Sequence, residues 1–351
     1  RIQRGSVKTN TPVTVIDKDG KTRNGRILKI MGYHGLERVD VDTAAAGDIV
    51  CITGLDALNI SDTICDPKNV EALPALSVDE PTVSMTFQVN NSPFAGKEGK
   101  FVTSRHLRDR LYGELEKNLA LRIEETASPD ALIVYGRGIL HLSILIETMR
   151  REGYELQLGQ PKVIVKEIDG KKCEPVEQLT ILVPDQFAGK IIEIVTMRKG
   201  EIDTIEQRGD RSQLEFTIPS RGIIGLRNNL LTVSEGEAII AHRLKGFEPW
   251  KGEIGGRRMG SLIAKETGTA IEYSINKLQD RGRFFVEPGE DVYTGMVVGE
   301  NIRPDDIVCN ITITKKLTNM RASGSDDKSS IAPAIKFSLE EAMEYIGEDE
   351  Y

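Results

Sequence analysis

The feature that most constrains the fold is an order of expected elements that occurs twice in the middle of the chain. Over residues 81–170 the apolar pattern predicts strand, helix, two strands, helix and strand, and residues 173–248 repeat that order. The second helix of each copy opens alike, with Arg137-Gly138-Ile139 and Arg221-Gly222-Ile223. This βαββαβ order is typical of ferredoxin-like domains, so we predict two of them in tandem.

The expected elements of each copy follow from the spacing of its apolar residues. In the first copy we expect strands over residues 82–89, 121–125, 131–135 and 162–168, and helices over 104–118 and 138–151. In the second we expect strands over 177–183, 202–207, 213–218 and 238–244, and helices over 188–198 and 222–233.

Different patterns flank the repeat. Residues 1–66 contain short strand-like runs separated by Gly and Asp, which predicts a small β-barrel, and the Pro-containing residues 67–80 have no clear period and indicate a linker. After Pro249 glycines are dense and strands dominate, which predicts a mainly β domain over residues 249–351. A capping box that begins at Ser338 predicts a helix near the end of the chain. Together these patterns predict an α+β multidomain protein.

Composition limits the classes of function. The 351 residues carry a net charge of −8, which excludes a protein that binds nucleic acid through an overall basic surface, so any RNA contact must be local. The four cysteines are too far apart for a CxxC pair, which is typical of a reduced, cytoplasmic protein. No apolar run approaches the roughly 18 residues of a membrane span. Because the chain opens at Arg1 in a strand-like pattern, we expect it to be a fragment of a longer protein.

No motif predicts a catalytic or metal site. The nearest match to a phosphate-binding P-loop is Gly20-Lys21-Thr22, but the glycine required five positions earlier is Val15, so the segment is better explained as a hairpin turn. The four histidines have no metal-ligand spacing, and no serine lies in GxSxG. We therefore expect no catalytic residue, no bound metal and no cofactor in this chain.

Basic segments near the C-terminus are the candidates for binding. Lys, Arg, Asn and Ser are the side chains that contact phosphates, 2′-hydroxyls and base edges. The candidate residues are Arg257, Arg258, Lys277, Arg281, Arg283, Lys315, Lys316, Asn319, Arg321 and Ser323. Phe284 and Phe285 follow Arg283 directly, and basic residues next to aromatic ones suit RNA, although one ring of an extended pair is expected in the core.

The distribution of charge along the chain makes local RNA binding compatible with the net negative charge. Residues 326–351 contain two Lys and eight Asp or Glu, so much of the acidity lies beyond the basic loop 315–325. A second basic group lies on the helix expected over residues 104–118, where a solvated helix face is the alternative explanation. The glycines of residues 252–260 leave a weaker alternative open, a cradle for phosphate.

Several of these segments resemble the BipA/TypA family of translational GTPases. The similar segments are SRGIIGLRNNLLTVSEGEAII, GGRRMGSLIAKETGTA, LQDRGRFF and KKLTNMRASGSD, and VDTAAAGDIVCITGLDALNISDTICD resembles the second-domain barrel of translation factors. The resemblance covers the whole chain. It implies an incomplete barrel, two domains like the third and fifth of elongation factor G, and a C-terminal domain peculiar to the family.

The resemblance also implies a function. It implies binding to the factor site of the 70S ribosome, contacts with 23S rRNA and the acceptor end of A-site tRNA, and a role in 50S assembly and in stress and cold adaptation. GTP and Mg²⁺ would belong to a GTPase domain that precedes Arg1, and the protein would be a cytoplasmic monomer. The RNA-contact role falls on loop 315–325, on Arg257-Arg258 and on the DRGR segment. The rival hypothesis is a protein-interaction scaffold, in which the ferredoxin-like pair mediates domain contacts and the acidic tail is a partner site. A metabolic enzyme with tandem α+β domains is a third hypothesis.

Overall fold

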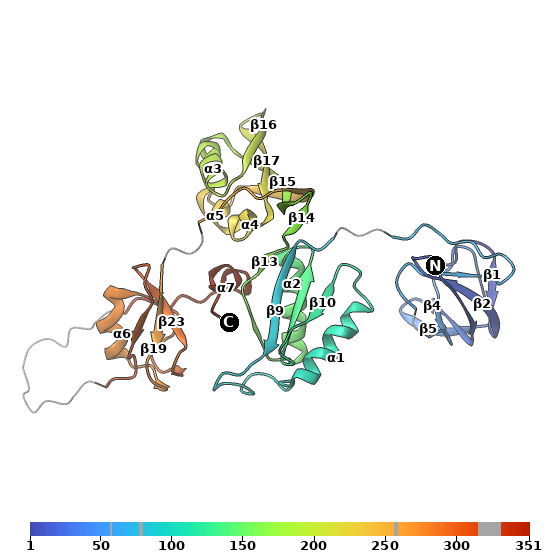
Figure 1. Cartoon of the computed structure of the whole chain (residues 1–351), viewed down its shortest axis with the longest axis horizontal. Helices are drawn as coiled ribbons and strands as arrows, with labels where there is room; N and C mark the ends of the chain where they lie inside the picture. The colour runs from blue at the N-terminus through green and yellow to red at the C-terminus, as the bar shows by residue number, and fades with distance from the viewer. Residues whose placement is uncertain (57, 77–79, 256–258, 315–330) are drawn as a thin grey trace, which may run out of the picture. The chain divides into compact units, whose positions relative to one another are not determined.

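The computed structural model describes residues 1–56, 58–76, 80–255, 259–314 and 331–351 (Figure 1). The chain divides into two compact units, one made of Arg1–Glu80 with Arg110–Leu121 and the other of Pro81–Asp109 with Arg122–Tyr351. Among the helices of these described residues, none is long and apolar enough to cross a membrane.

The N-terminal region is built from short strands, as predicted. They are β1 (Ser6–Lys8), β2 (Thr11–Ile16), β3 (Thr22–Ile27), β4 (Lys29–His34), β5 (Glu37–Val41), β6 (Thr43–Ala45), β7 (Cys51–Thr53) and β8 (Thr63–Cys65). They pair as three sheets, β1-β6, β3-β2-β8 and β5-β4-β7, and not as one closed ladder. Val13, Ile27, Ile30 and Ala44 come from all three sheets and share one buried cluster, so the sheets enclose a common core.

The two predicted ferredoxin-like domains are confirmed by strand order. The first sheet contains β9 (Val83–Val89), β10 (Arg122–Glu125), β11 (Ala131–Gly136) and β12 (Leu156–Leu158), in the order β10-β11-β9-β12. The second contains β15 (Lys171–Pro184), β16 (Glu201–Arg208), β17 (Arg211–Pro219) and β18 (Ile239–Pro249); β15 lies between β18 and β17, and β16 flanks β17. In each sheet the first strand therefore lies between the fourth and the third, and all the pairs are antiparallel.

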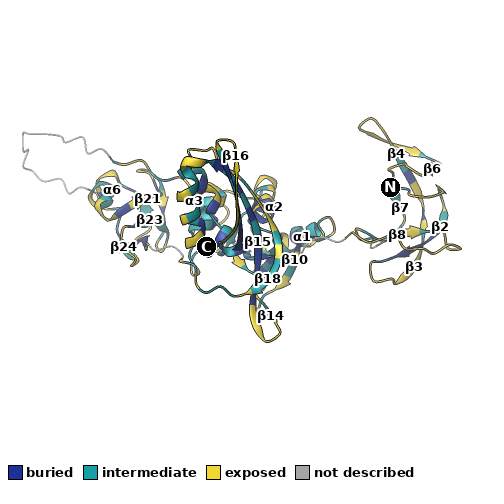
Figure 2. Cartoon of the chain, turned by 90° about the horizontal axis from the view of Figure 1, so that it is seen from above, coloured by how far each residue is buried: buried dark blue, intermediate teal, exposed yellow. Residues whose placement is uncertain are grey.

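Helices occupy the predicted places between these strands. They are α1 (Ser104–Leu115) and α2 (Ile139–Glu152) in the first copy, and α3 (Asp185–Met197), α4 (Ser220–Ile223) and α5 (Leu226–Val233) in the second. In the second copy, Ile191 of α3 and Leu230 of α5 pack into one core cluster with Phe216 of β17. Figure 2 shows buried residues along β15 and exposed residues on the outer side of α3. This one-sided burial is what holds amphipathic helices on a sheet.

The strand predicted over residues 162–168 is wrong as a single element. The fourth strand of the first sheet is β12, and only β13 (Lys162–Val163) of the predicted strand also pairs with β9. The rest, β14 (Lys166–Ile168), pairs with β15 in the second sheet. Pro161 offers no backbone N–H, so β12 and β13 cannot form one continuous ladder. The segment therefore passes from the first sheet to the second.

The helix predicted over residues 222–233 is also divided. Gly225 adopts a left-handed conformation with φ of 68°, which ends α4 and begins α5. Glycine reaches this region without the cost that a Cβ imposes.

A buried ion pair connects the second sheet with the segment that follows it. Glu174 of β15 is fully buried, and its carboxylate accepts hydrogen bonds from Arg221 of α4, with Nη2 to Oε1 at 3.0 Å, and from the backbone N–H of Lys251 at 2.8 Å. The Arg221 guanidinium lies 3.9 Å from the ring centroid of Trp250 and also donates to the carbonyl of Gly252. Because the charges of Glu174 and Arg221 are both removed from water, each is stabilised only while the other is present.

We expect Glu174→Ala to destabilise the protein by about 3–5 kcal/mol, because it leaves the mostly buried Arg221 charge without its carboxylate. Urea unfolding followed by the emission of Trp250, the only tryptophan, measures this change beside the site itself. Glu193→Ala removes an exposed carboxylate that pairs with Lys190 at 2.8 Å, and it is the matched control, expected within about 0.5 kcal/mol of the unmodified chain. Equal midpoints for both variants would contradict the role of the pair.

Candidate nucleic-acid interface

A four-stranded sheet and the helical segment that leads into it carry the candidate residues that the structure describes. We call this sheet the third sheet, counted after the sheets of the two ferredoxin-like domains. It contains β19 (Ser261–Ala264), β21 (Gly282–Phe284), β23 (Val297–Asn301) and β24 (Ile307–Cys309), in the order β21-β23-β19-β24. A two-stranded ladder of β20 (Gly268–Thr269) and β22 (Asp291–Val292) accompanies it. A short helix, α6 (Glu272–Leu278), accompanies the sheet, and the single turn η1 (Gln279–Arg281) leads from α6 directly into β21. This arrangement confirms a mainly β region after Pro249.

The close approach of two strands explains why residue 282, in the DRGR segment over residues 280–283, is glycine. A Cβ at this position would collide with the carbonyl oxygen of Glu300 on β23. Its φ of 170° is ordinary extended backbone, so glycine is required here for space and not for conformation. The close approach lets β21 pair with β23 in the register Gly282↔Asn301 and Arg283↔Glu300. Gly282 thus positions the two arginines on either side of it.

The three described candidates, Lys277, Arg281 and Arg283, are all exposed. Arg283 lies 3.9 Å from Glu300 but remains 74% exposed, and an exposed pair at this distance holds a side chain weakly. The side chains of Lys277 and Arg281 have no hydrogen bond or ion pair with any residue that the structure describes. These cations lie on consecutive elements, α6, η1 and β21, and can approach an external anion.

One ring of the Phe284-Phe285 pair lies in the core, as expected from the sequence. Phe284 is only 6% exposed and belongs to the core of the third sheet. The ring of Phe285 lies 4.9 Å from that of Phe337 and 5.1 Å from that of Tyr345, centroid to centroid. Strand alternation buries one ring, and aromatic packing engages the other. The described cations therefore suit phosphate contacts, without base stacking on these two rings.

The other candidates lie outside the described residues and stay predictions. They are Arg257, Arg258, Lys315, Lys316, Asn319, Arg321 and Ser323.

The basic group on α1 fits the alternative of a solvated helix face. Arg105 lies 3.7 Å from Asp109, one turn along the helix, and Arg108 lies 2.7 Å from Glu125. Both arginines already have carboxylate partners at the surface.

Sequence reasoning missed a cation held on an aromatic ring. The ammonium of the exposed Lys172 lies 3.9 Å from the ring centroid of Trp250, the same distance as the Arg221 guanidinium. Within the described part of the chain Lys172 has no ion pair with a carboxylate. A ring positions a cation without neutralising its charge. The two residues are too far apart in the sequence for any local pattern to reveal this contact.

One thiol lies beside the candidate cations. Burial raises the pKa of Cys309 above its ordinary value, and the nearby Arg281 charge opposes this only in part. The neutral thiol behaves as a small apolar side chain of the core.

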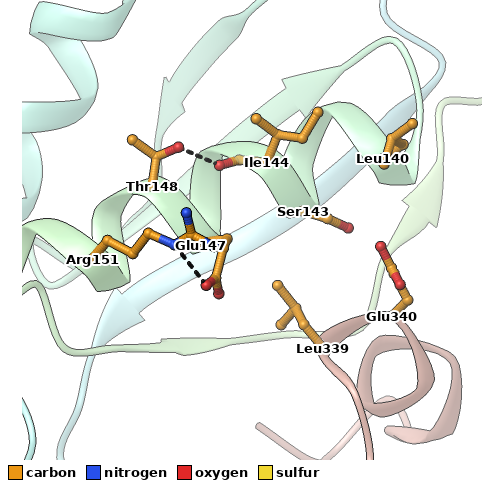
Figure 3. Close-up of a pocket in the computed structure, with 8 residues that line it drawn as sticks. All are labelled: Leu140, Ser143, Ile144, Glu147, Thr148, Arg151, Leu339 and Glu340. Atoms are coloured by element: carbon orange, nitrogen blue, oxygen red, sulfur yellow. Dashed lines mark hydrogen bonds and ion pairs between the residues drawn. The ribbon is translucent and has the colours of Figure 1, made fainter.

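A cavity of about 440 Å³ lies between α2 and the C-terminal helix α7 (Leu339–Tyr345), as Figure 3 shows. Its two hydroxyl groups are engaged, because Ser143 Oγ donates to the Ile139 carbonyl and Thr148 Oγ1 to the Ile144 carbonyl. Its residue Glu147 is paired with Arg151 at 3.1 Å. The described residues, masked positions apart, contain no group of three or more His, Cys, Asp or Glu placed to hold a metal.

We expect Gly282→Ala to destabilise the third sheet by about 1–3 kcal/mol, because the new methyl group must push β21 away from β23. Gly138→Ala is the matched control, since Gly138 also has φ of 170° but open space around its Cβ position. Thermal unfolding of both variants checks this, and an unchanged melting temperature for Gly282→Ala would contradict the close approach.

Comparison with known proteins identifies three regions. Residues 259–351 match the TypA/BipA C-terminal domain, residues 171–258 match the elongation factor G C-terminus, and residues 1–65 match domain 2 of elongation factor Tu.

Relatives extend over the whole chain. The protein from Haemophilus influenzae named large ribosomal subunit assembly factor BipA is 53% identical over 352 residues, which cover 100% of this chain and 57% of that protein. Proteins of the same name from Salmonella typhimurium and Bacillus subtilis are 52% and 47% identical, each over 100% of this chain and 58% of their own length. The chain thus spans somewhat more than half of these relatives. These matches confirm the resemblance to the BipA/TypA family that the sequence predicts.

Proposed function

We propose that this chain is the ribosome-binding portion of a translational GTPase that acts in assembly of the large ribosomal subunit. The observation that carries the proposal is identity of 47–53% across the entire chain to proteins named large ribosomal subunit assembly factor BipA. The matches to the elongation factor G C-terminus and to elongation factor Tu domain 2 support a place among translation factors.

The exposed cations give this proposal a physical basis. Lys277, Arg281 and Arg283 occupy consecutive elements of one small sheet domain, and Gly282 holds the two arginines close to the β23 backbone. Cations on helices and strands are positioned more precisely than cations on loops, which suits contacts that orient a protein on a phosphate backbone. Lys172, which rests on Trp250, is a further candidate for a phosphate contact.

The finer parts of the proposal rest on the family resemblance. We place the docking site at the factor site of the 70S ribosome, with 23S rRNA and the acceptor end of A-site tRNA as the RNA partners. Loop 315–325 would supply Lys315, Lys316 and Arg321 for phosphates, and Asn319 and Ser323 for hydroxyl groups or base edges. GTP and Mg²⁺ would be held by a separate GTPase domain. The protein would act as a cytoplasmic monomer, with a role in stress and cold adaptation.

Replacing Arg281 and Arg283 by Ala tests the described part of this interface. The slope of log affinity against log salt concentration is negative, and each lost phosphate contact should reduce its magnitude by about 0.7–0.9. Co-sedimentation of the variant with purified 70S ribosomes across a salt series gives that slope. Lys190→Ala is the matched control, because Lys190 is already paired with Glu193 and lies outside the proposed interface.

An unchanged slope in the double variant would exclude Arg281 and Arg283 as phosphate contacts. Binding that does not respond to salt at all would favour the rival hypothesis, a protein-interaction scaffold. Deleting the segment after Pro249 separates the two further, since a scaffold through residues 82–246 should keep its partner.

A further inference from the structure

The last residues of the chain contact both ferredoxin-like domains and the third sheet. We call residues 338–351 the C-terminal clasp. Its helix α7 begins with the predicted capping box, in which the Ser338 backbone N–H donates to Glu341 Oε2 at 2.8 Å and the Glu341 N–H donates to Ser338 Oγ at 3.4 Å. These reciprocal bonds fix where the helix starts.

Both ends of the clasp are attached to the third sheet. Just before its start, the Ile335 N–H donates to the Phe284 carbonyl at 2.9 Å, and in its middle the Tyr345 ring packs on Phe285. Near its end, Ser261 Oγ donates to Glu350 Oε1 at 2.7 Å. The clasp therefore leaves the third sheet and returns to it.

Between these attachments the clasp contacts the first ferredoxin-like domain. Leu339 of α7 faces α2 across the cavity that Ser143 also lines (Figure 3). The Gln160 side-chain amide donates to the Ile346 carbonyl at 3.1 Å, and Lys162 lies 3.7 Å from Glu348. Gln160 and Lys162 flank Pro161, where the chain leaves β12 for β13.

The contact with the second ferredoxin-like domain is made by Glu344. The carboxylate of Glu344 occupies the space where a side chain at Gly225 would begin, so any Cβ there would collide with it. Arg198 Nη2 lies 3.8 Å from Glu344, and the same guanidinium donates to the carbonyls of Gly222, at 3.3 Å, and Ile224. Arg198 thus holds the end of α4 and the clasp together.

We propose that Glu344, which packs against Gly225 and pairs with Arg198, is a catch that keeps the C-terminal clasp closed against the ferredoxin-like domains and the third sheet. When the catch is released, the clasp loses its contact with the second ferredoxin-like domain, while its ends stay on the third sheet. The clasp is thereby a built-in control on how firmly these domains are joined. It acts within the chain and does not depend on ribosome binding.

Gly225→Ala in the full chain tests the catch, with Gly209→Ala as the matched control. Both glycines have left-handed backbone, with φ of 68° and 70°, so both variants carry the same conformational cost. Only at position 225 does the new methyl group displace Glu344, because nothing lies near the Cβ position of Gly209. Hydrogen exchange by mass spectrometry over residues 342–351 reports on the clasp.

We expect exchange at least ten times faster in Gly225→Ala than in Gly209→Ala or the unmodified chain. Glu344→Ala opens the catch without altering the backbone, so it should show the same acceleration, and it decides the matter if Gly225→Ala fails to fold. Exchange in Glu344→Ala equal to that of the unmodified chain would overturn the proposal. So would equal exchange in the two glycine variants.

Discussion

The structure of the larger unit depends on the contacts of one short segment, residues 220–225. On one side Arg221 pairs with the fully buried Glu174 and lies against Trp250. On the other side Gly225 leaves room for the Glu344 carboxylate, beside Arg198. Buried charges persist only where partners replace the lost water, so the fully buried Glu174 does not tolerate the loss of Arg221. Through these pairs the segment connects the second sheet with Trp250, which directly follows that sheet, and with Glu344 of α7.

Contacts within the chain also give the acidic residues near the C-terminus a structural role. Glu341 caps α7, Glu344 lies beside Arg198, Glu348 beside Lys162, and Glu350 accepts from Ser261. Burial raises the pKa of Glu344, although Arg198 opposes that shift. These carboxylates have structural partners within the chain, which leaves less reason to regard them as a binding site for a foreign protein. Among the described residues, Lys277 and Arg281 have no carboxylate partner, and Arg283 pairs with Glu300 at 3.9 Å while remaining 74% exposed.

Much of the fold could be predicted from sequence because it rests on local periodicity. The repeated element order identified both ferredoxin-like sheets, and the Ser338 capping box located α7. The three-residue β12 is too short to show an alternating pattern, so residues 162–168 were expected to fill its place. Gly225 interrupts a helix whose apolar spacing continues on either side, so the spacing alone predicted one helix.

The candidate site was less predictable than the fold. Exposure of Lys277, Arg281 and Arg283 follows from their charge, but the cover that Phe337 and Tyr345 place on Phe285 depends on residues some fifty positions away in the sequence. The same holds for Lys172 on Trp250 and for Glu174 beside Arg221. Contacts between distant residues leave no local period, so a single sequence does not reveal them.

The central claim, that this chain binds the large ribosomal subunit through phosphate contacts, is tested most directly with the unmodified protein. Its co-sedimentation with purified 50S subunits is measured from low to high salt, with 30S subunits in parallel. The account predicts binding to 50S subunits whose log affinity falls linearly with log salt concentration. Failure to pellet with 50S subunits at low salt, or an affinity for them that salt leaves unchanged, would contradict it.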